Sequence, residues 1–192
     1  LSQQELLARI ERHARSSLAM AQGFVQLASA QAHDYHSAPF DLAAVLEETV
    51  DDAWASAQDH QVQVRITTRP DAAPLHGDRG LICRAITNTL GNAIKFSPAG
   101  SSVQCALTSE APYWVISVRD QGPGIAPEQQ SNLFQPFKRL HEGSHPGIAG
   151  VGLGLALVQT VMQRHGGRVQ VRSSSGAGAE FRLLLPQDMQ EK

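Results

Sequence analysis

The sequence predicts an α/β sandwich: a two-layer fold in which one mixed, mostly antiparallel sheet carries helices on one face. Beyond residue 40, segments with apolar residues at helical spacing are interspersed with short segments in which every second residue is apolar. Some consecutive strands are separated by a helix and others only by a turn, which predicts both parallel and antiparallel neighbours. The 192 residues, 42% of them hydrophobic, suffice for one core plus a helical appendage.

Residues 2–32 are expected to form one long helix, because they contain no proline and a single glycine. Two arrangements remain open: pairing with other helices in a bundle, or a lone amphipathic helix lying on the globular domain. We divide the chain into residues 1–36, which contain this helix, and 37–192, a globular domain. A heptad seam of mostly small residues follows the helix at Leu7, Ile10, Ala14, Ser17, Ala21, Phe24 and Ala28.

The globular part is expected to begin near Phe40, after an extended link over residues 37–42 in which Asp41 can cap the next helix. The patterns that follow predict a helix marked by residues 42–53, then a strand that alternates over 62–66 and continues to near Pro70, and then a helix over 78–96. Two strands are expected next, over 103–108 and 114–120, followed by a helix over 152–165 and strands over 168–173 and 180–185.

Composition excludes several classes of partner. A net charge of −2 without a basic stripe argues against nucleic acid. No apolar run approaches the roughly 20 residues that span a bilayer, so no membrane contact is expected. Cys83 and Cys105 fall on apolar stretches, which is typical of buried thiols in a reducing compartment rather than of a disulfide.

The helix over residues 78–96 carries a mostly amide stripe at spacings of four, four and three: Arg84, Asn88, Asn92 and Lys95. Asparagine is a poor helix former, so two of them one turn apart indicate a specific task rather than a solvated face. Mg²⁺ prefers hard oxygen ligands and commonly joins protein groups to phosphates. The stripe therefore predicts a metal-phosphate site.

Two glycine-rich segments add candidate ligand contacts. Asp120 ends a strand directly before Gln-Gly122-Pro-Gly124, where its carboxylate could accept from an exocyclic amino group, although an ordinary turn is the simpler alternative. The run from Gly150 to Leu155 opens a helix, so free amides could face phosphates. A dinucleotide fold would need a strand just before these glycines, and a phosphate-loop NTPase would need Gly-Lys-Ser/Thr; neither is evident.

Five segments follow one another in a fixed order: Asn88 to Lys95, Asp120 to Gly124, Leu133-Phe-Gln-Pro-Phe137, Gly150 to Leu155 and Gly176-Ala-Gly178. This order resembles the ATP-binding region of sensor histidine kinases. The resemblance covers residues 40–186 strongly and the first helix weakly. It implies that Asn92 contacts Mg²⁺ and that Lys95 approaches phosphate. Related hydrolytic ATPases carry a glutamate base at the position of Asn88, and an amide cannot take that proton. ATP would thus be kept for transfer, with Asn88, Asn92 and Lys95 as the catalytic set.

The resemblance also assigns the remaining nucleotide contacts. Asp120 would read adenine, and a lid over residues 135–149 would be anchored by Phe134 and Phe137, with Lys138 or Arg139 reaching the γ-phosphate or remaining solvated. The family usually has threonine where this chain has Ala179, which puts affinity in doubt. The full set of expected ATP contacts is Asn92, Lys95, Asp120, Gly122, Gly124, Ile125, Phe137, Lys138, Arg139, Gly150, Val151, Gly152, Leu153, Gly154, Leu155 and Ala179.

Two histidine patterns call for other interpretations. His141-Glu-Gly-Ser-His145 matches the zinc-protease pattern, but the neighbouring glycines and Pro146 disfavour the helix that zinc chemistry needs. His13 lies beside the heptad seam and lacks the acidic and Thr-Pro neighbours of a phosphoacceptor, so a structural role is favoured.

The expected function is therefore the catalytic ATP-binding domain of a sensor histidine kinase with ATP and Mg²⁺ as cofactors. The resemblance implies phosphoryl transfer to a histidine on an upstream helix, onward transfer to a response regulator, a homodimer formed through the bundle, and a cytoplasmic location. The fragment alone should bind ATP without labelling itself. The alternatives are a non-catalytic nucleotide-binding or dimerisation module that controls a partner kinase, and a stand-alone kinase of serine.

Overall fold

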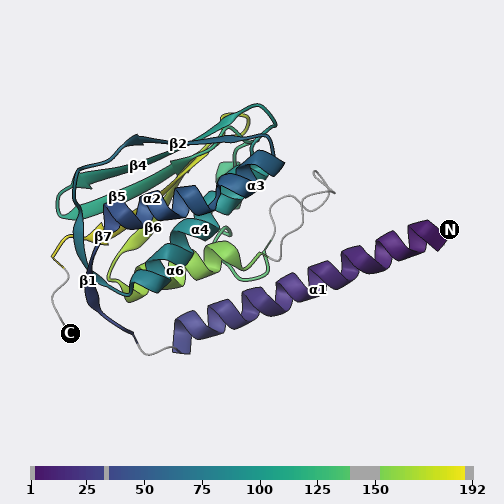
Figure 1. The fold of residues 1–192 in the computed structure, drawn as a ribbon, viewed down its shortest axis with the longest axis horizontal. Coiled ribbons are helices and arrows are strands. Elements are labelled where there is room, and N and C mark those ends of the chain that lie inside the picture. The colour runs from purple at the N-terminus through teal and green to yellow at the C-terminus, as the bar shows by residue number, and fades with distance from the viewer. Residues whose placement is uncertain (1–2, 33–34, 139–151, 189–192) are drawn as a thin grey trace.

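The computed structural model describes residues 3–32, 35–138 and 152–188 (Figure 1). The elements in chain order are α1 (Gln3–Ala32), β1 (Ala38–Asp41), α2 (Leu42–Asp52), α3 (Trp54–Asp59), β2 (Gln63–Thr68), β3 (Pro74–Gly77), α4 (Arg79–Phe96), β4 (Ser102–Glu110), β5 (Tyr113–Arg119), α5 (Pro127–Gln130), α6 (Gly154–Arg164), β6 (Arg168–Ser173) and β7 (Ala179–Pro186).

The main sheet has five strands in the order β2-β4-β5-β7-β6. Strand β2 is parallel to β4, and every other neighbouring pair is antiparallel. Helices α2, α4 and α6 cover one face of this sheet (Figure 1). The predicted two-layer sandwich with a mixed, mostly antiparallel sheet is confirmed.

The core lies between the sheet and these helices. Alternate residues of the three central strands point into it: Val103, Cys105, Leu107, Ile116, Val118, Leu183 and Leu185. Helix α4 buries one face against them, with Leu81, Ile82, Ala85, Ile86, Leu90, Ala93 and Ile94 at spacings of one, three and four. Burial raises the pKa of the Cys105 thiol to about 12, so this cysteine is an inert core residue, as predicted.

Three elements differ from the sequence-based expectation, two of them short strands and one a helix that begins later. The extended link proves to be strand β1, which pairs with β3 in a two-stranded sheet. Strand β3 was not predicted, because four residues that begin with Pro74 have neither the length nor the composition of a typical strand. Helix α6 begins at Gly154, two residues later than expected.

Helix α1 extends from the globular part, and its C-terminal portion lies beside α6 (Figure 1). Leu27 and Ala30 are buried there, whereas the predicted seam residues Leu7, Ile10 and Phe24 are each more than half exposed. The helix thus rests on the domain by one end and presents its apolar seam to solvent. Among the described residues, no helix is both long and apolar enough to cross a membrane.

Candidate functional site

The amide stripe of α4 meets the start of α6. A Cβ atom at Gly154 would lie 2.9 Å from the Asn88 Oδ1 and 3.8 Å from the Asn92 Nδ2. The Asn88 side chain is held by its Nδ2, which donates to the Arg84 carbonyl at 2.9 Å. Two of the predicted segments, far apart in the chain, are therefore in contact, and amide oxygens are suitable ligands for Mg²⁺ at this junction.

The N-terminus of α6 lacks the side-chain cap that an N-cap residue can supply, because its N-cap residue is Leu153, which makes no such hydrogen bond. The first amides of a helix lack intrahelical partners and carry the positive end of its dipole. Because a ligand is one of the partners that can satisfy such amides, the helix start can accept an anion at the point where the two asparagines arrive.

Phe137 and Lys138 close on Gly152. The Phe137 backbone N–H donates to the Gly152 carbonyl at 3.0 Å, and a Cβ at Gly152 would lie 2.7 Å from the Lys138 carbonyl oxygen. The Phe137 side chain is 54% exposed, and the contact with Gly152 is made by its backbone, which has a φ of 64°. Phe134 does pack into a small apolar cluster.

Asp120 is 6% exposed and follows the last residue of β5. Its Oδ1 accepts from the backbone N–H groups of Gly122 at 2.8 Å and Ala179 at 3.0 Å. Burial raises the pKa of this carboxyl group, and the two hydrogen bonds partly oppose that rise. Because both bonds reach Oδ1, the other oxygen, Oδ2, can accept from the amino group of a ligand.

Two glycines let the predicted segments pack on each other. A Cβ at Gly124, where φ is 70°, would lie 1.9 Å from the Ser174 carbonyl oxygen. One at Gly178, where φ is 73°, would lie 2.2 Å from the Asp120 carbonyl oxygen. Both positions therefore require glycine, and together they join the Asp120 turn to the segment before β7.

A small apolar cluster links three of the segments predicted to contact ATP. Ile125, Leu133, Ala179 and Phe181 form its buried part, and Phe134, Leu155 and Val171 pack against it. The cluster thus brings the expected contacts Ile125, Leu155 and Ala179 together. It is separate from the main core and lies beside Asp120, where it can provide an apolar surface for a base.

Sequence reasoning missed two contributions to this site. Ala179 holds Asp120 through its backbone N–H, so the threonine that the family usually has is not needed for that bond. Ser173 accepts from the Ile125 N–H at 2.8 Å and donates to the Gly178 carbonyl at 2.6 Å, which ties the two glycine turns together. A serine at the end of a strand gives no signal in a single sequence that would reveal such a contact.

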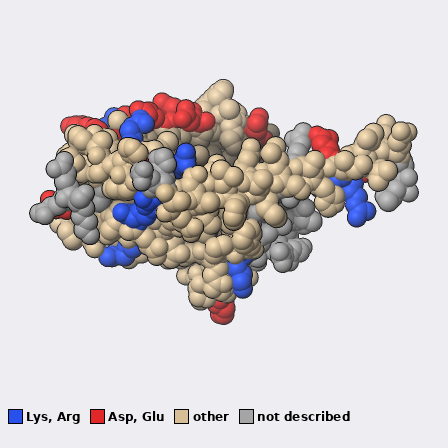
Figure 2. Space-filling view, turned by 90° about the horizontal axis from the view of Figure 1, so that it is seen from below, with Lys and Arg blue, Asp and Glu red and all other residues tan. Residues whose placement is uncertain are grey.

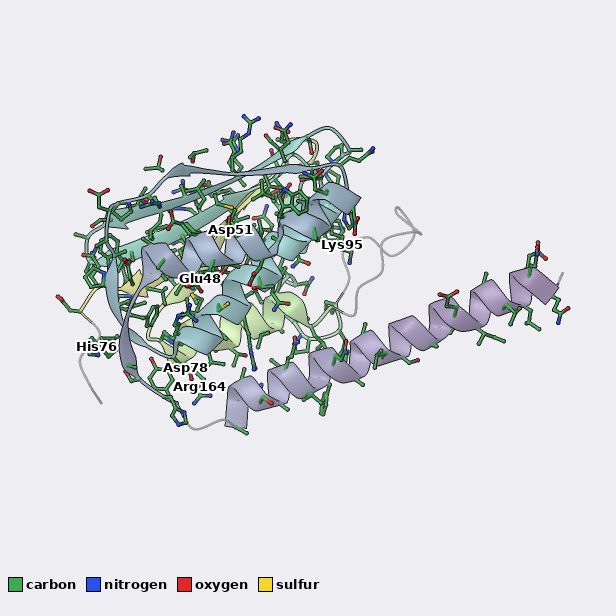
Figure 3. The ribbon with its side chains drawn as sticks, in the orientation of Figure 1. Glu48, Asp51, His76, Asp78, Lys95 and Arg164 are labelled. Atoms are coloured by element: carbon green, nitrogen blue, oxygen red, sulfur yellow. The ribbon has the colours of Figure 1, made fainter. Side chains whose placement is uncertain are left out.

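The remaining predicted residues either lie away from these contacts or fall outside the described residues. Lys95 lies at the opposite end of α4 from Asp78, with its Nζ 5.2 Å from the centre of the Phe96 ring (Figure 3). Arg139, Gly150 and Val151 lie outside the described residues, as do the motif His141 to His145 and most of the predicted lid. His13 is on α1, at an exposed position.

Comparison with known proteins identifies what this arrangement resembles. Residues 77–189 match the family described as histidine kinase-, DNA gyrase B- and HSP90-like ATPases. The chain is 35% identical over 146 residues to the sensor-like histidine kinase SenX3 of Mycobacterium tuberculosis, covering 76% of this chain and 35% of SenX3. It is 33% identical over 182 residues to the sensor protein CutS of Streptomyces coelicolor, covering 94% of this chain and 42% of CutS.

Solved structures give the same result. The mycobacterial sensor histidine kinase MprB superposes with a TM-score of 0.68 and 29% identity, over 79% of this chain and 97% of that one. Full-length ShkA in complex with AMPPNP superposes with a TM-score of 0.77 and 25% identity, over 97% of this chain and 39% of ShkA. The chain thus spans only about two fifths or less of the curated relatives reported above.

Proposed function

The chain belongs to the family of histidine kinase-, DNA gyrase B- and HSP90-like ATPases, and on this premise we propose that it binds Mg²⁺-ATP and donates the γ-phosphoryl group to a histidine of a sensor histidine kinase. The observation that carries the proposal is the meeting of Asn88 and Asn92 with the uncapped N-terminus of α6. Amide oxygens and free backbone N–H groups there suit a metal-bound polyphosphate.

Each end of the nucleotide has a candidate partner. The Asp120 Oδ2 would accept from the amino group of adenine, and guanine lacks that donor. The apolar cluster around Ile125 would cover one face of the base. Asn92 would hold Mg²⁺, and the metal would supply charge neutralisation for the phosphates. Lys95, about one turn further along α4, would add a positive charge on the same side of the helix.

Asn88 distinguishes transfer from hydrolysis in this proposal. Its amide cannot act as a general base for water. Its Nδ2 donates to the Arg84 carbonyl within α4, which leaves its Oδ1 facing the start of α6 as an acceptor that takes no proton from water. Phosphoryl transfer needs mainly positioning and charge stabilisation, so the attacking nucleophile would come from a histidine presented to the site.

The exposed seam of α1 supports a place in a helical bundle. Leu7, Ile10 and Phe24 are more than half exposed, which is costly for a helix that stays alone. We propose that this seam pairs with the helix that carries the acceptor histidine and with a second copy in a homodimer. A response regulator would then receive the phosphoryl group, as expected for relatives that are sensor kinases.

The rival function is a nucleotide-binding module without catalysis. Its best support was Ala179, which stands where the family usually has a threonine. That support is weakened because the residue at this position contacts Asp120 through its backbone N–H.

Titration calorimetry tests the proposal. The native chain should bind ATP in the presence of Mg²⁺ and should bind GTP roughly fivefold to 150-fold more weakly, since a lost polar match costs about 1–3 kcal/mol. Asn92→Ala should lose most of the Mg²⁺-dependent affinity, whereas the half-buried control Asn132→Ala, which lies outside the amide stripe, should retain it. Equal affinity for ATP and GTP would remove Asp120 from base recognition, and unchanged binding by Asn92→Ala would remove the metal role.

A further inference from the structure

The C-terminal part of α1 lies along α6 by a single face. This docking face consists of Gly23, Leu27 and Ala30, which are spaced four and three residues apart. Leu27 is 8% exposed, Ala30 is fully buried, and both belong to the same core cluster as Leu153. The docking face is on roughly the opposite side of α1 from the heptad seam. Docking on α6 therefore leaves the seam free, and the surface of α1 seen in Figure 2 is mostly uncharged.

At the start of α6, Gly23 packs directly on Leu153. A Cβ at Gly23 would lie 3.1 Å from the Leu153 Cδ1 and 3.5 Å from its Cβ. Leu153 is 3% exposed and has little room to move. It stands between Gly152, which bonds to Phe137, and Gly154, which meets Asn88. The contact from α1 therefore reaches the middle of the segment that would bind phosphate.

At the end of α6, Arg164 holds the last turn of α1. Its Nη1 donates to the Ala30 carbonyl at 2.5 Å, and its guanidinium carbon lies 5.7 Å from the centre of the Tyr35 ring. The last carbonyls of a helix lack intrahelical partners, so Arg164 acts as a cap supplied by another helix. Arg164 lies about 15 Å along α6 from Gly154. Its side chain faces the end of α1 (Figure 3).

We infer that the docking of α1 on α6 holds Leu153 in place and so prepares the start of α6 for the nucleotide, with Gly23 and Arg164 as positioning residues. The inference rests on the proposed nucleotide site. Without α1, Leu153 would lose its contact with Gly23. Nucleotide binding would then have to order the Gly152 to Gly154 segment. Affinity would fall by that ordering cost, and by linkage the nucleotide would tighten the docking of α1 in return.

Four variants of the full chain test this coupling by Mg²⁺-ATP calorimetry. Gly23→Leu should raise Kd roughly fivefold to 30-fold, the equivalent of ordering about one residue. Arg164→Gln, which is remote from the phosphates, should raise Kd by a smaller factor in the same direction. Gln22→Leu adds the same side chain to the neighbouring exposed position and should leave Kd unchanged. Arg164→Lys should retain more of the affinity than Arg164→Gln, because lysine keeps a donor for the Ala30 carbonyl.

Hydrogen exchange of the native chain supplies a readout that needs no variant. AMPPNP with Mg²⁺ should slow amide exchange over residues 24–32, and this protection should be absent in Gly23→Leu. The coupling is refuted, while the nucleotide site stands, if ATP binds equally well to the native chain, Gly23→Leu and Arg164→Gln. It is also refuted if the nucleotide leaves the hydrogen exchange of α1 in the native chain unchanged. A native chain that binds no ATP refutes the proposed function and the coupling together.

Discussion

Helices α4 and α6 pack against each other, yet their N-termini are built in opposite ways. Helix α4 begins with a side-chain cap: the Asp78 Oδ1 accepts from the Leu81 N–H at 3.0 Å. Helix α2 has the same device, since the Asp41 Oδ1 accepts from the Ala43 N–H at 2.9 Å. Helix α6 has Leu153 as its N-cap residue, with no side-chain bond to its first turn.

The difference separates anchoring from binding. A carboxylate at the start of a helix satisfies a free N–H and complements the dipole, which fixes the helix in the fold. At α6 that place is held by Leu153, which has no polar side chain and lies between two glycines, and the Asn88 side chain of α4 reaches the first residue of the helix. A phosphate bound there would take the part that Asp41 and Asp78 play in the other two helices.

The largest effect should come from filling the uncapped start. Gly154→Val places a Cβ 2.9 Å from the Asn88 Oδ1 and displaces the amide stripe, so Mg²⁺-ATP affinity should fall by roughly 2 kcal/mol, about 30-fold. Gly80→Val, in the first turn of the capped helix α4, is the matched control and should not change affinity. Calorimetry measures both. Equal losses in the two variants would mean that the two helix starts do not differ in function.

Removing a cap should have the converse result. Asp78→Ala leaves the Leu81 N–H without its partner, so the free energy of unfolding should fall by about 1–2 kcal/mol, while ATP affinity changes less than in Gly154→Val. Asp71→Ala, an exposed loop position, controls for the loss of charge. Urea unfolding checks the prediction. A loss of affinity without a loss of stability would contradict the separation of anchoring from binding.

The sequence predicted the layers of the fold well because they follow from local periodicity. The buried face of α4 and the alternation in β4 and β5 are strong signals, and the order of helices and strands implied a mixed sheet. Strand β3 and the short helix α3 were missed. Each has fewer than seven residues, and β3 exists only because β1, more than 30 residues away, pairs with it.

The candidate site was predicted as separate segments rather than as an arrangement. The residue types of Asn88, Asn92 and Asp120 signalled their chemistry, and the structure brings Asn88 to Gly154 and Asp120 to Ala179. The backbone role of Ala179 and the attachment of Phe137 through its N–H could not be predicted, because backbone contacts do not depend on which side chain is present. The roles of Asn92 and Lys95 toward ATP stay predictions.

The smallest effect concerns the pH dependence of the capped helix. His165 is 2% exposed, its Nε2 accepts from the Asp78 N–H at 3.1 Å, and its Nδ1 lies 2.8 Å from the Val161 carbonyl oxygen. This geometry requires a neutral ring that donates from Nδ1. Burial lowers the pKa of His165, and the nearby Arg164 adds to that, although the Val161 carbonyl and the Asp78 carboxylate oppose it.

Because the pKa of His165 is lower in the folded state than its ordinary value of about 6.5, the unfolded chain takes up a proton first as pH falls. Stability is therefore full above about pH 6.5 and decreases below it, by at most about 1.4 kcal/mol per pH unit, until the folded pKa is reached. His165→Gln keeps an acceptor for the Asp78 N–H and should remove this slope, whereas the exposed control His60→Gln should keep it. Urea unfolding from pH 7.5 to pH 5 measures the free energy of unfolding of each variant. If this free energy depends on pH in the same way in the native chain and in His165→Gln, His165 is not the group that lowers the stability in acid.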